Sequence, residues 1–287
     1  MVKELREMTG AGMMECKKAL VEADGNIDQA VDVLRTRGLA AVAKKAGRAT
    51  SEGLVGFELA ADGKSGVAVE VKCETDFVAR GDKFQGFVKD MVAQVAKGEY
   101  ADSEALLAAP FVADASVTVK EALDGVIATT GENMGLGKFA KMELAAGKSG
   151  LIGGYLHSNG KLAGLVEMQT GSDAAAASEA FHEVAKNVAM QIAALNPRFW
   201  DKTQVTKDVL DEEKKIMMVQ MENDPKMASK PEQVREKIVL GKLNKFYSEN
   251  CLLQQELVKD NAMTVEQYIA SVAKTLGGPL SFKHPLR

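Results

Sequence analysis

The chain has 287 residues, of which 46% are hydrophobic and 26% are charged, and its formal net charge is −4 at pH 7. These values are ordinary for a soluble globular protein with one large or two smaller domains, and they give no electrostatic case for a nucleic-acid-binding protein. No apolar run reaches the length of about 18 residues that predicts a membrane span. The first residues also lack the apolar core of a signal peptide.

Cysteine and histidine are rare and scattered. The 3 cysteines are odd in number and far apart, and the 3 histidines have no metal-ligand spacing. We therefore expect a cytoplasmic protein with no cofactor and no metal. The sequence contains no phosphate loop, nucleophile elbow or dinucleotide fingerprint, which indicates a binding protein and not an enzyme. An enzyme that uses Cys73 as its nucleophile is an open alternative, and it predicts a low thiol pKa.

The first 37 residues predict three short helices. Glycines end the first two, and the apolar residues of the third recur at helical spacing. A three-helix unit of this size, with a glycine-rich first loop, resembles the ubiquitin-associated fold. Met13 and Met14 follow that loop, and methionine suits adaptable contact surfaces. One of the two is expected to fill the small core. The predicted helices are Val2–Met8, Met13–Ala23 and a third, capped by Asn26 or Asp28, that stops at Gly38.

Residues 38–52 predict a linker rich in alanine, glycine and lysine. From Arg35 to Arg48 the chain has five basic residues and no acidic one. Such a segment can touch RNA or another phosphate-bearing surface, but we favour the solvated face of a linker. Residues 1–50 are therefore predicted to form an N-terminal partner-binding module with its linker.

Residues 53–146 predict a subdomain of strands and helices. Two alternating apolar segments are joined by Ala61-Asp62-Gly63-Lys64, and Asp-Gly between such segments is typical of a hairpin. The next helix has its apolar side chains on one face, which predicts packing on the hairpin. The expected strands are Leu54–Leu59, Val67–Cys73 and Lys138–Leu144, and the expected helices contain Phe84–Val95 and Val119–Thr129.

Residues 150–287 repeat this order. Residues 53–96 align without gaps to residues 150–193, with 14 identical pairs among 44, and residues 118–131 align more weakly to residues 264–277. The offsets of 97 and 146 residues differ by 49, so the second copy carries an insertion of about that length. We therefore predict an α+β fold whose core is two duplicated subdomains with antiparallel sheets and helices.

The insertion lies near residues 200–250, and it is rich in charge and shows no strand pattern. Two amphipathic segments flank a proline-containing turn, which predicts an antiparallel helical hairpin. Such a hairpin has little core of its own, so we expect its apolar stripe to pack on the body or on a second copy of the chain. The expected stripes are Val205, Val209, Ile216 and Val219 on one helix, and Val234, Ile238 and Leu243 on the other.

The segment after the second strand reads Glu74-Thr75-Asp76-Phe77-Val78-Ala79-Arg80. Threonine and aspartate cap helix N-termini, so Phe77 falls in the first turn after a strand. The second copy keeps the cap types, as Ser172-Asp173, but has alanine in place of Phe77 and Val78. Phe77 either packs against its own helix or stands out as an anchor for a partner, since aromatic side chains dominate interface hot spots.

Three segments resemble the signature segments of the bacterial translation elongation factor Ts family. They are residues 9–20, residues 74–80 and residues 245–260, and the likeness extends over nearly the whole chain. The resemblance implies an N-terminal module, two related core subdomains and a helical hairpin used for homodimer contacts. It also implies guanine-nucleotide exchange on the GTPase elongation factor Tu during translation elongation, without covalent chemistry.

The resemblance further implies which residues contact the GTPase. Asp76 and Phe77, flanked by Thr75 and Val78, match the pair that intrudes near the partner's magnesium and phosphate region. Three residues of the N-terminal module and one of the second subdomain match other contact positions; they are Arg6, Met13, Met14 and His157. We expect no direct contact with nucleic acid or with a membrane.

An alternative function is that of an adaptor that binds ubiquitin-like proteins, for which residues 1–50 alone would suffice. That alternative leaves the internal repeat unexplained.

Overall fold

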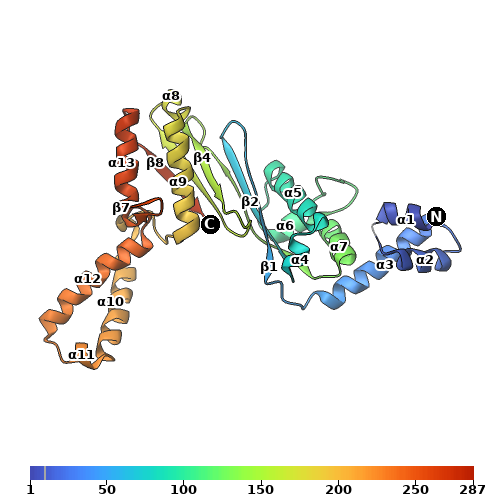
Figure 1. The fold of residues 1–287 in the computed structure, drawn as a ribbon, viewed down its shortest axis with the longest axis horizontal. Coiled ribbons are helices and arrows are strands. Elements are labelled where there is room, and N and C mark those ends of the chain that lie inside the picture. Colours follow the sequence, from blue (N-terminus) through green and yellow to red (C-terminus); the bar gives the residue numbers. More distant parts are fainter. Residues whose placement is uncertain (10) are drawn as a thin grey trace. The chain divides into compact units, whose positions relative to one another are not determined.

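The computed structural model describes residues 1–9 and 11–287 and combines helices with antiparallel sheets (Figure 1). The predicted α+β class is confirmed. Gly10, in the expected glycine-rich loop, lies outside the described residues. The chain divides into two compact units, Met1–Glu58 with Val67–Lys141 and Leu59–Gly66 with Met142–Arg287.

The N-terminal module has the three predicted helices, α1 (Val2–Thr9), α2 (Met13–Glu22) and α3 (Ile27–Lys45). Asn26 caps α3, because its side-chain oxygen accepts a hydrogen bond from the Gln29 N–H at 3.0 Å. The helices enclose a small core that consists of Leu5, Cys16, Ala19, Leu20, Ala23 and Ala30.

The third helix does not stop at Gly38, so the prediction of a linker is wrong for residues 38–45. Gly38 lies where α3 packs on α7 (Val119–Thr130), and a Cβ there would meet the Ala128 Cβ at 3.4 Å. Farther along the helix, Val42 is buried in the core of the first unit. Alanine is the strongest helix former, so the alanine-rich sequence and this packing together outweigh one glycine.

Arginines of the basic segment pair with carboxylates of the first unit. Arg35 pairs with Glu121 on α7 and Arg37 pairs with Glu22 on α2. Arg48 lies 3.5 Å from Glu74. These contacts favour a role within the protein over binding of an external phosphate.

The first unit is built on a sheet in which β2 (Ser65–Cys73) lies between β1 (Glu52–Leu59) and β3 (Met134–Glu143). Helix α5 (Asp82–Lys97) shares one core with β2 and α7. Its apolar face is the predicted one and consists of Phe84, Phe87, Val88, Met91, Val92 and Val95. A short helix, α6 (Ser103–Ala108), was not predicted from the sequence.

The second unit repeats this plan. Strand β5 (Ala163–Thr170) pairs antiparallel with β4 (Ser149–Leu156) and with β8 (Ser281–Leu286). Helix α9 (Glu179–Leu195) packs on β4 and β5, and α13 (Val265–Leu276) packs on α9.

Matched helices begin at matched positions. A capping box starts both α7 and α13, with Thr118 and Glu121 in one and Thr264 and Gln267 in the other.

A buried glutamine holds the same loop in both copies. The Gln94 amide donates to the Pro110 carbonyl at 3.1 Å and accepts from the Val112 N–H at 2.6 Å. Gln191, its match in the second copy, donates to the Glu256 carbonyl at 3.0 Å and accepts from the Val258 N–H at 2.8 Å. Glu256 and Val258 follow Pro110 and Val112 by 146 residues, the offset of the weaker of the two sequence matches. The weaker match therefore corresponds to a repeated structure. A small unpredicted sheet, β6 (Glu256–Leu257) and β7 (Asp260–Thr264), contains the second loop.

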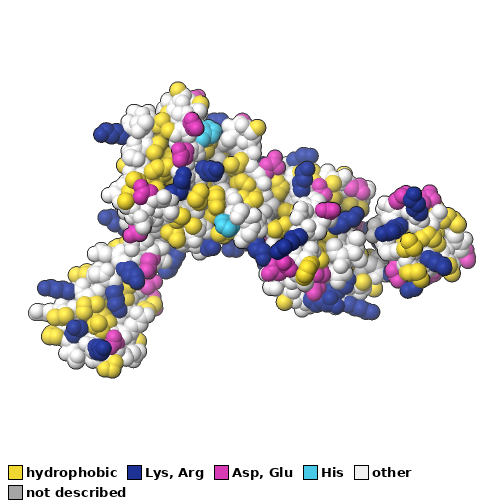
Figure 2. All heavy atoms as spheres, viewed as in Figure 1, with side chains coloured by type: hydrophobic (Ala, Val, Ile, Leu, Met, Phe, Trp, Pro, Cys, Tyr) yellow, Lys and Arg dark blue, Asp and Glu magenta, His cyan; other side chains and the backbone are white. Residues whose placement is uncertain are grey.

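The insertion forms the predicted helical hairpin, with α10 (Lys207–Glu222) packed on α12 (Glu232–Asn250) and α11 (Pro225–Ala228) at the turn. The predicted stripe is confirmed for Val205, Val209, Ile238 and Leu243, which pack inward. It is wrong for Ile216, Val219 and Val234, which are exposed. The hairpin buries Met221 with Val239 and Leu243, and these pack with Leu210 and Met217. The inner face thus combines methionine with valine and leucine, and hydrophobic side chains remain at the hairpin surface (Figure 2).

Gly53 lies in β1 and tests how closely β1 and β2 approach each other in the first unit. Its φ is +149°, and a Cβ there would lie 2.2 Å from the Val71 carbonyl oxygen. We expect Gly53→Ala to lower the free energy of unfolding by about 2 kcal/mol or more. Gly86→Ala is the control, because nothing lies within 4 Å of its Cβ position on α5, and it should raise stability by about 0.5–1 kcal/mol. Equal urea midpoints for the two variants would contradict this packing.

Candidate partner-binding site

The candidate site is the short helix α4 (Asp76–Ala79), which begins three residues after β2 ends. Phe77 is 83% exposed, whereas Ala79 is buried and Val78 packs partly buried against the core of the first unit. The helix therefore turns Val78 and Ala79 inward and holds Phe77 out in solvent. Val78, one of the predicted contact residues, anchors the helix to the core of the first unit.

The second copy shows the same pattern without the aromatic ring. Helix α8 (Asp173–Ala176) buries Ala176 and exposes Ala174, which matches Phe77. Because both copies expose this position, a large side chain there adds nothing to the core. The alternative in which Phe77 packs against its own helix is wrong. An exposed aromatic side chain on a rigid support is typical of a protein-binding anchor.

Asp76 lies beside Phe77 and pairs with Arg80, with 3.1 Å between the carboxylate oxygen and the guanidinium nitrogen. The Arg80 side chain is largely exposed and the Asp76 side chain is about half exposed. Exposed ion pairs contribute about 0–1 kcal/mol, so the Asp76 carboxylate can exchange Arg80 for another partner at little cost.

Thr75 holds the base of the helix. Its hydroxyl accepts from the Val78 N–H at 3.4 Å and donates to Glu132 at 2.6 Å. The Glu132 carboxylate also accepts from the N–H groups of Glu74 at 3.2 Å and Thr75 at 3.0 Å. Glu132 was not singled out from the sequence, because it lies one residue beyond the end of the second repeat match.

The neighbouring Glu74 and Asn133 extend this network. Glu74 accepts from the Asn133 N–H at 2.6 Å. The Asn133 side chain donates to the Arg48 carbonyl at 2.7 Å and to the Ala46 carbonyl at 3.4 Å. The base of α4 is thus joined by hydrogen bonds to the segment that follows α3.

The predicted contacts of the N-terminal module lie on its surface. Arg6 is exposed on α1, and Met13 and Met14 are 59% and 61% exposed on α2. The expectation that one methionine fills the core is wrong. The buried positions of α2, namely Cys16, Ala19 and Leu20, already form a stripe at helical spacing that begins after the two methionines.

His157 lies in the second unit, in the turn between β4 and β5, and its side chain is exposed. Its Nδ1 accepts from the Asn159 N–H at 3.5 Å, and its ring lies edge-on to Tyr155 with 6.4 Å between the centroids. The structure therefore brings Thr75, Asp76, Phe77 and Val78 together in one unit and places His157 in the other.

Cys73 does not have the properties of a nucleophile. The thiol is buried and donates to the Thr75 carbonyl at 3.2 Å. Burial, together with the negative charge of Glu132, raises the pKa of Cys73 to about 11. The alternative of a cysteine enzyme required a low thiol pKa, so the structure contradicts it.

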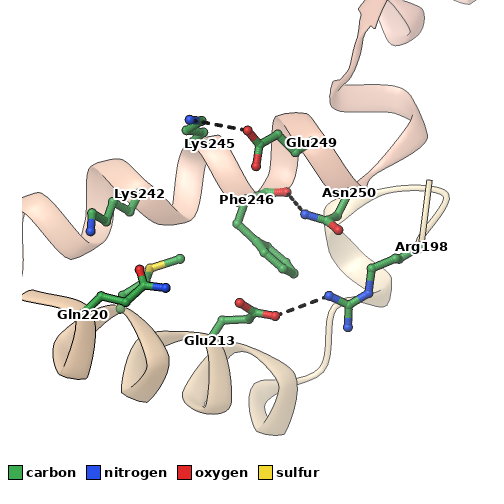
Figure 3. A pocket seen from close by; sticks show the side chains of 9 residues that line it. Arg198, Glu213, Gln220, Lys242, Lys245, Phe246, Glu249 and Asn250 are labelled. Carbon is green, nitrogen blue, oxygen red and sulfur yellow. Dashed lines mark hydrogen bonds and ion pairs between the residues drawn. The ribbon is translucent and has the colours of Figure 1, made fainter. Parts of the chain in front are cut away.

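A pocket of about 420 Å³ lies at the base of the hairpin between α10 and α12. Phe246 points into it, and Arg198 lies 5.8 Å from the centroid of that ring and 3.3 Å from Glu213 (Figure 3). On the rim, Lys245 lies 3.5 Å from Glu249. These charges form ion pairs with each other, which indicates a structural role for this region.

Among residues 1–9 and 11–287, no helix is both long and apolar enough to cross a membrane. The same residues contain no cluster of three or more histidine, cysteine, aspartate or glutamate side chains that could hold a metal ion.

Comparisons of the chain with a family model and with individual relatives agree on one family. Residues 74–284 match the family model described as Elongation factor TS. Elongation factor Ts of Trichlorobacter lovleyi is 46% identical over 98% of this chain and 88% of its own length. Elongation factor Ts of Clostridium kluyveri is 45% identical over 100% of this chain and 90% of its own length. The chain therefore belongs to the elongation factor Ts family of bacterial translation elongation factors.

The thiol environment predicts slow alkylation. Because the pKa values of Cys73 and Cys251 are raised to about 11, their thiolate fractions at pH 8 are only about 0.1%. We expect Cys73 and Cys251 of the folded protein to resist iodoacetamide at pH 8, with reactivity at both positions increasing as the pH approaches 11. Intact-mass measurement should find all 3 cysteines modified after denaturation. Rapid modification of Cys73 in the folded protein would contradict this environment.

Proposed function

We propose that this protein is a guanine-nucleotide exchange factor that promotes GDP release from elongation factor Tu. The observation that carries the proposal is the exposed Phe77, beside Asp76 on a capped short helix, in a chain of the elongation factor Ts family. The protein acts in the cytoplasm during translation elongation and performs no covalent chemistry.

The mechanism follows from linkage. An exchange factor binds the nucleotide-free GTPase more tightly than the nucleotide-bound form. Reciprocity requires that it weaken nucleotide binding by the same factor by which nucleotide weakens its own binding. The energy for GDP release is therefore the differential affinity of this protein for the two states of the GTPase.

Phe77 and Asp76 supply this differential affinity in two ways. The phenylalanine ring acts as a wedge that displaces side chains supporting the magnesium and phosphate site of the GTPase. The Asp76 carboxylate, released from Arg80, adds negative charge near phosphates that are already negative. Both effects oppose bound nucleotide, and neither opposes the empty state.

Other exposed residues complete the contact with the GTPase. We assign Arg6, Met13 and Met14 of the N-terminal module to its nucleotide-binding domain and His157 to a second contact. Residues 1–50 are the partner-binding module in this assignment, and residues 53–146 and 150–287 are the two core subdomains.

Removal of the ring tests the wedge. We expect Phe77→Ala to slow release of labelled GDP by about 2 kcal/mol of activation free energy, or roughly thirtyfold, because the variant loses an interface anchor. Its thermal unfolding should match that of the parent, since the ring contributes no buried surface.

Two variants serve as controls for Phe77→Ala. Val258→Ala also removes an exposed apolar side chain and should exchange normally. Adding Ala174→Phe to Phe77→Ala moves the ring to the matched position of the second copy and should not restore exchange. Normal exchange by Phe77→Ala would refute the wedge.

We also propose that the hairpin associates with the hairpin of a second copy of the chain. Val219 and Leu240 are 55% and 61% exposed on α10 and α12. Apolar side chains so exposed on a two-helix hairpin need a covering surface, and the internal repeat closes without this insertion.

Shortening the hairpin tests this association. Replacing residues 214–240 by a short Gly/Ser linker keeps the cluster of Val205, Phe246 and Cys251 at its base, and loop closure adds little cost. We expect a folded protein whose mass by sedimentation is that of the monomer. Val219→Lys with Leu240→Lys should do the same, whereas Gln233→Lys, which adds a charge at an exposed polar position of α12, should not. An unchanged mass for all variants would refute the proposed dimer contact.

A further inference from the structure

Two turns of the first unit hold each other by reciprocal hydrogen bonds. The turn after β2 donates the N–H groups of Glu74 and Thr75 to Glu132, and the turn after α7 donates the Asn133 N–H to Glu74. We propose that Glu132 is the positioning residue for the exchange reaction, because it sets the orientation from which α4 presents Phe77. This inference rests on the proposed function.

The geometry concentrates three hydrogen bonds on one carboxylate. Besides the two N–H groups, Glu132 accepts from the Thr75 hydroxyl at 2.6 Å. That hydroxyl must then direct a lone pair toward the Val78 N–H, so the carboxylate orients the cap of α4. Hydrogen bonds to an ionised acceptor are about twice as strong as neutral ones. Glu132 is therefore the strongest polar support at the base of the helix.

The second copy shows that this support is not needed to form the turn. Ser172 caps α8 in the same way, with 3.2 Å between its hydroxyl and the Ala175 N–H. The position that matches Glu132 is Gly278, which has no side chain to supply a carboxylate. The glutamate thus occurs in the copy with the exposed phenylalanine and is missing from the copy with alanine, as expected of a residue that serves the anchor.

A fixed base matters because α4 has only four residues. Such a short helix contributes little rigidity of its own, so the direction of Phe77 depends on what holds its ends. Val78 and Ala79 hold one side of α4 by packing against the core. Glu132 holds the N-terminal end of α4 through its hydrogen bonds. Ordering the helix before the encounter removes an entropy cost that insertion of the ring would otherwise carry.

The hydrogen bonds at the base of α4 also connect this helix to the N-terminal module. Asn133, the neighbour of Glu132, donates its side-chain N–H groups to the carbonyls of Ala46 and Arg48. These residues follow directly after α3, whose first half packs in the module. The turn that positions Phe77 is therefore tied to the segment that leads from the module.

The experiment measures labelled GDP release from elongation factor Tu at increasing concentrations of each variant. We expect Glu132→Ala to lower the maximal release rate by about tenfold and the half-saturating concentration to change less. Glu132→Gln keeps one acceptor oxygen and should recover part of the loss. Glu104→Gln, which removes the charge of an exposed glutamate on α6, is the matched control and should exchange normally.

A double-mutant cycle shows whether Glu132 acts through Phe77. If it does, Glu132→Ala should have little further effect in a Phe77→Ala background. An equal effect in both backgrounds would overturn the inference, because Glu132 would then act elsewhere. Normal exchange by Glu132→Ala with impaired Phe77→Ala would overturn it as well and leave the proposed function standing. Normal exchange by Phe77→Ala would refute the wedge and this inference with it, whereas absence of exchange by the parent protein would refute the proposed function itself.

Amide hydrogen exchange measures, in the free protein, whether Glu132 protects the amides at the base of α4. The amides of Glu74, Thr75 and Val78 should lose protection in Glu132→Ala, and the matched amide of Ala175 on α8 should not change. Equal protection of these amides in the parent and the variant would overturn the inference. If Glu132→Ala unfolds, Glu132→Gln supplies both measurements, with rates expressed per folded molecule.

Discussion

The structure depends on burial of one face of a long helix against a hairpin, once in each unit. Cys73 at the end of β2 and Phe84 at the start of α5 are both fully buried, so the chain between them must turn from the end of the strand to the helix within a few residues. It does so as a capped turn, with Ala79 inward and Phe77 outward. Exposure at position 77 is therefore a consequence of the core, and the same core exposes Ala174 in the second copy.

Duplication separates what the fold needs from what the site adds. Both copies keep the cap at Thr75 or Ser172 and the buried glutamine that holds the following loop. Only the first copy has Phe77, and only it has a glutamate at the position of Glu132. Residues that differ while the surrounding geometry is kept are the ones for which a functional reason is needed.

Much of this organisation was predictable because its signals are local. The hairpin turns, the apolar faces of α5 and α9 and the beginnings of α7 and α13 follow from periodicity and capping residues. The continuation of α3 past Gly38 was not predictable, because it depends on packing against α7 and on burial of Val42. The inner face of the hairpin was predicted only in part, because methionines fill it together with valines and leucines. Glu132 was missed because its partners are more than 50 residues away.

The proposed mechanism requires Phe77 to touch the GTPase near its nucleotide site. The direct measurement is photocrosslinking with p-benzoylphenylalanine in place of Phe77, using purified nucleotide-free elongation factor Tu and mass spectrometry of the linked peptides. The same substitution at Ala174 is the control. We expect a crosslink from position 77 to the segments around the magnesium and phosphate site, suppressed by added GDP, and none to these segments from position 174. Equal crosslinking from both positions, or none from position 77, would contradict this mechanism.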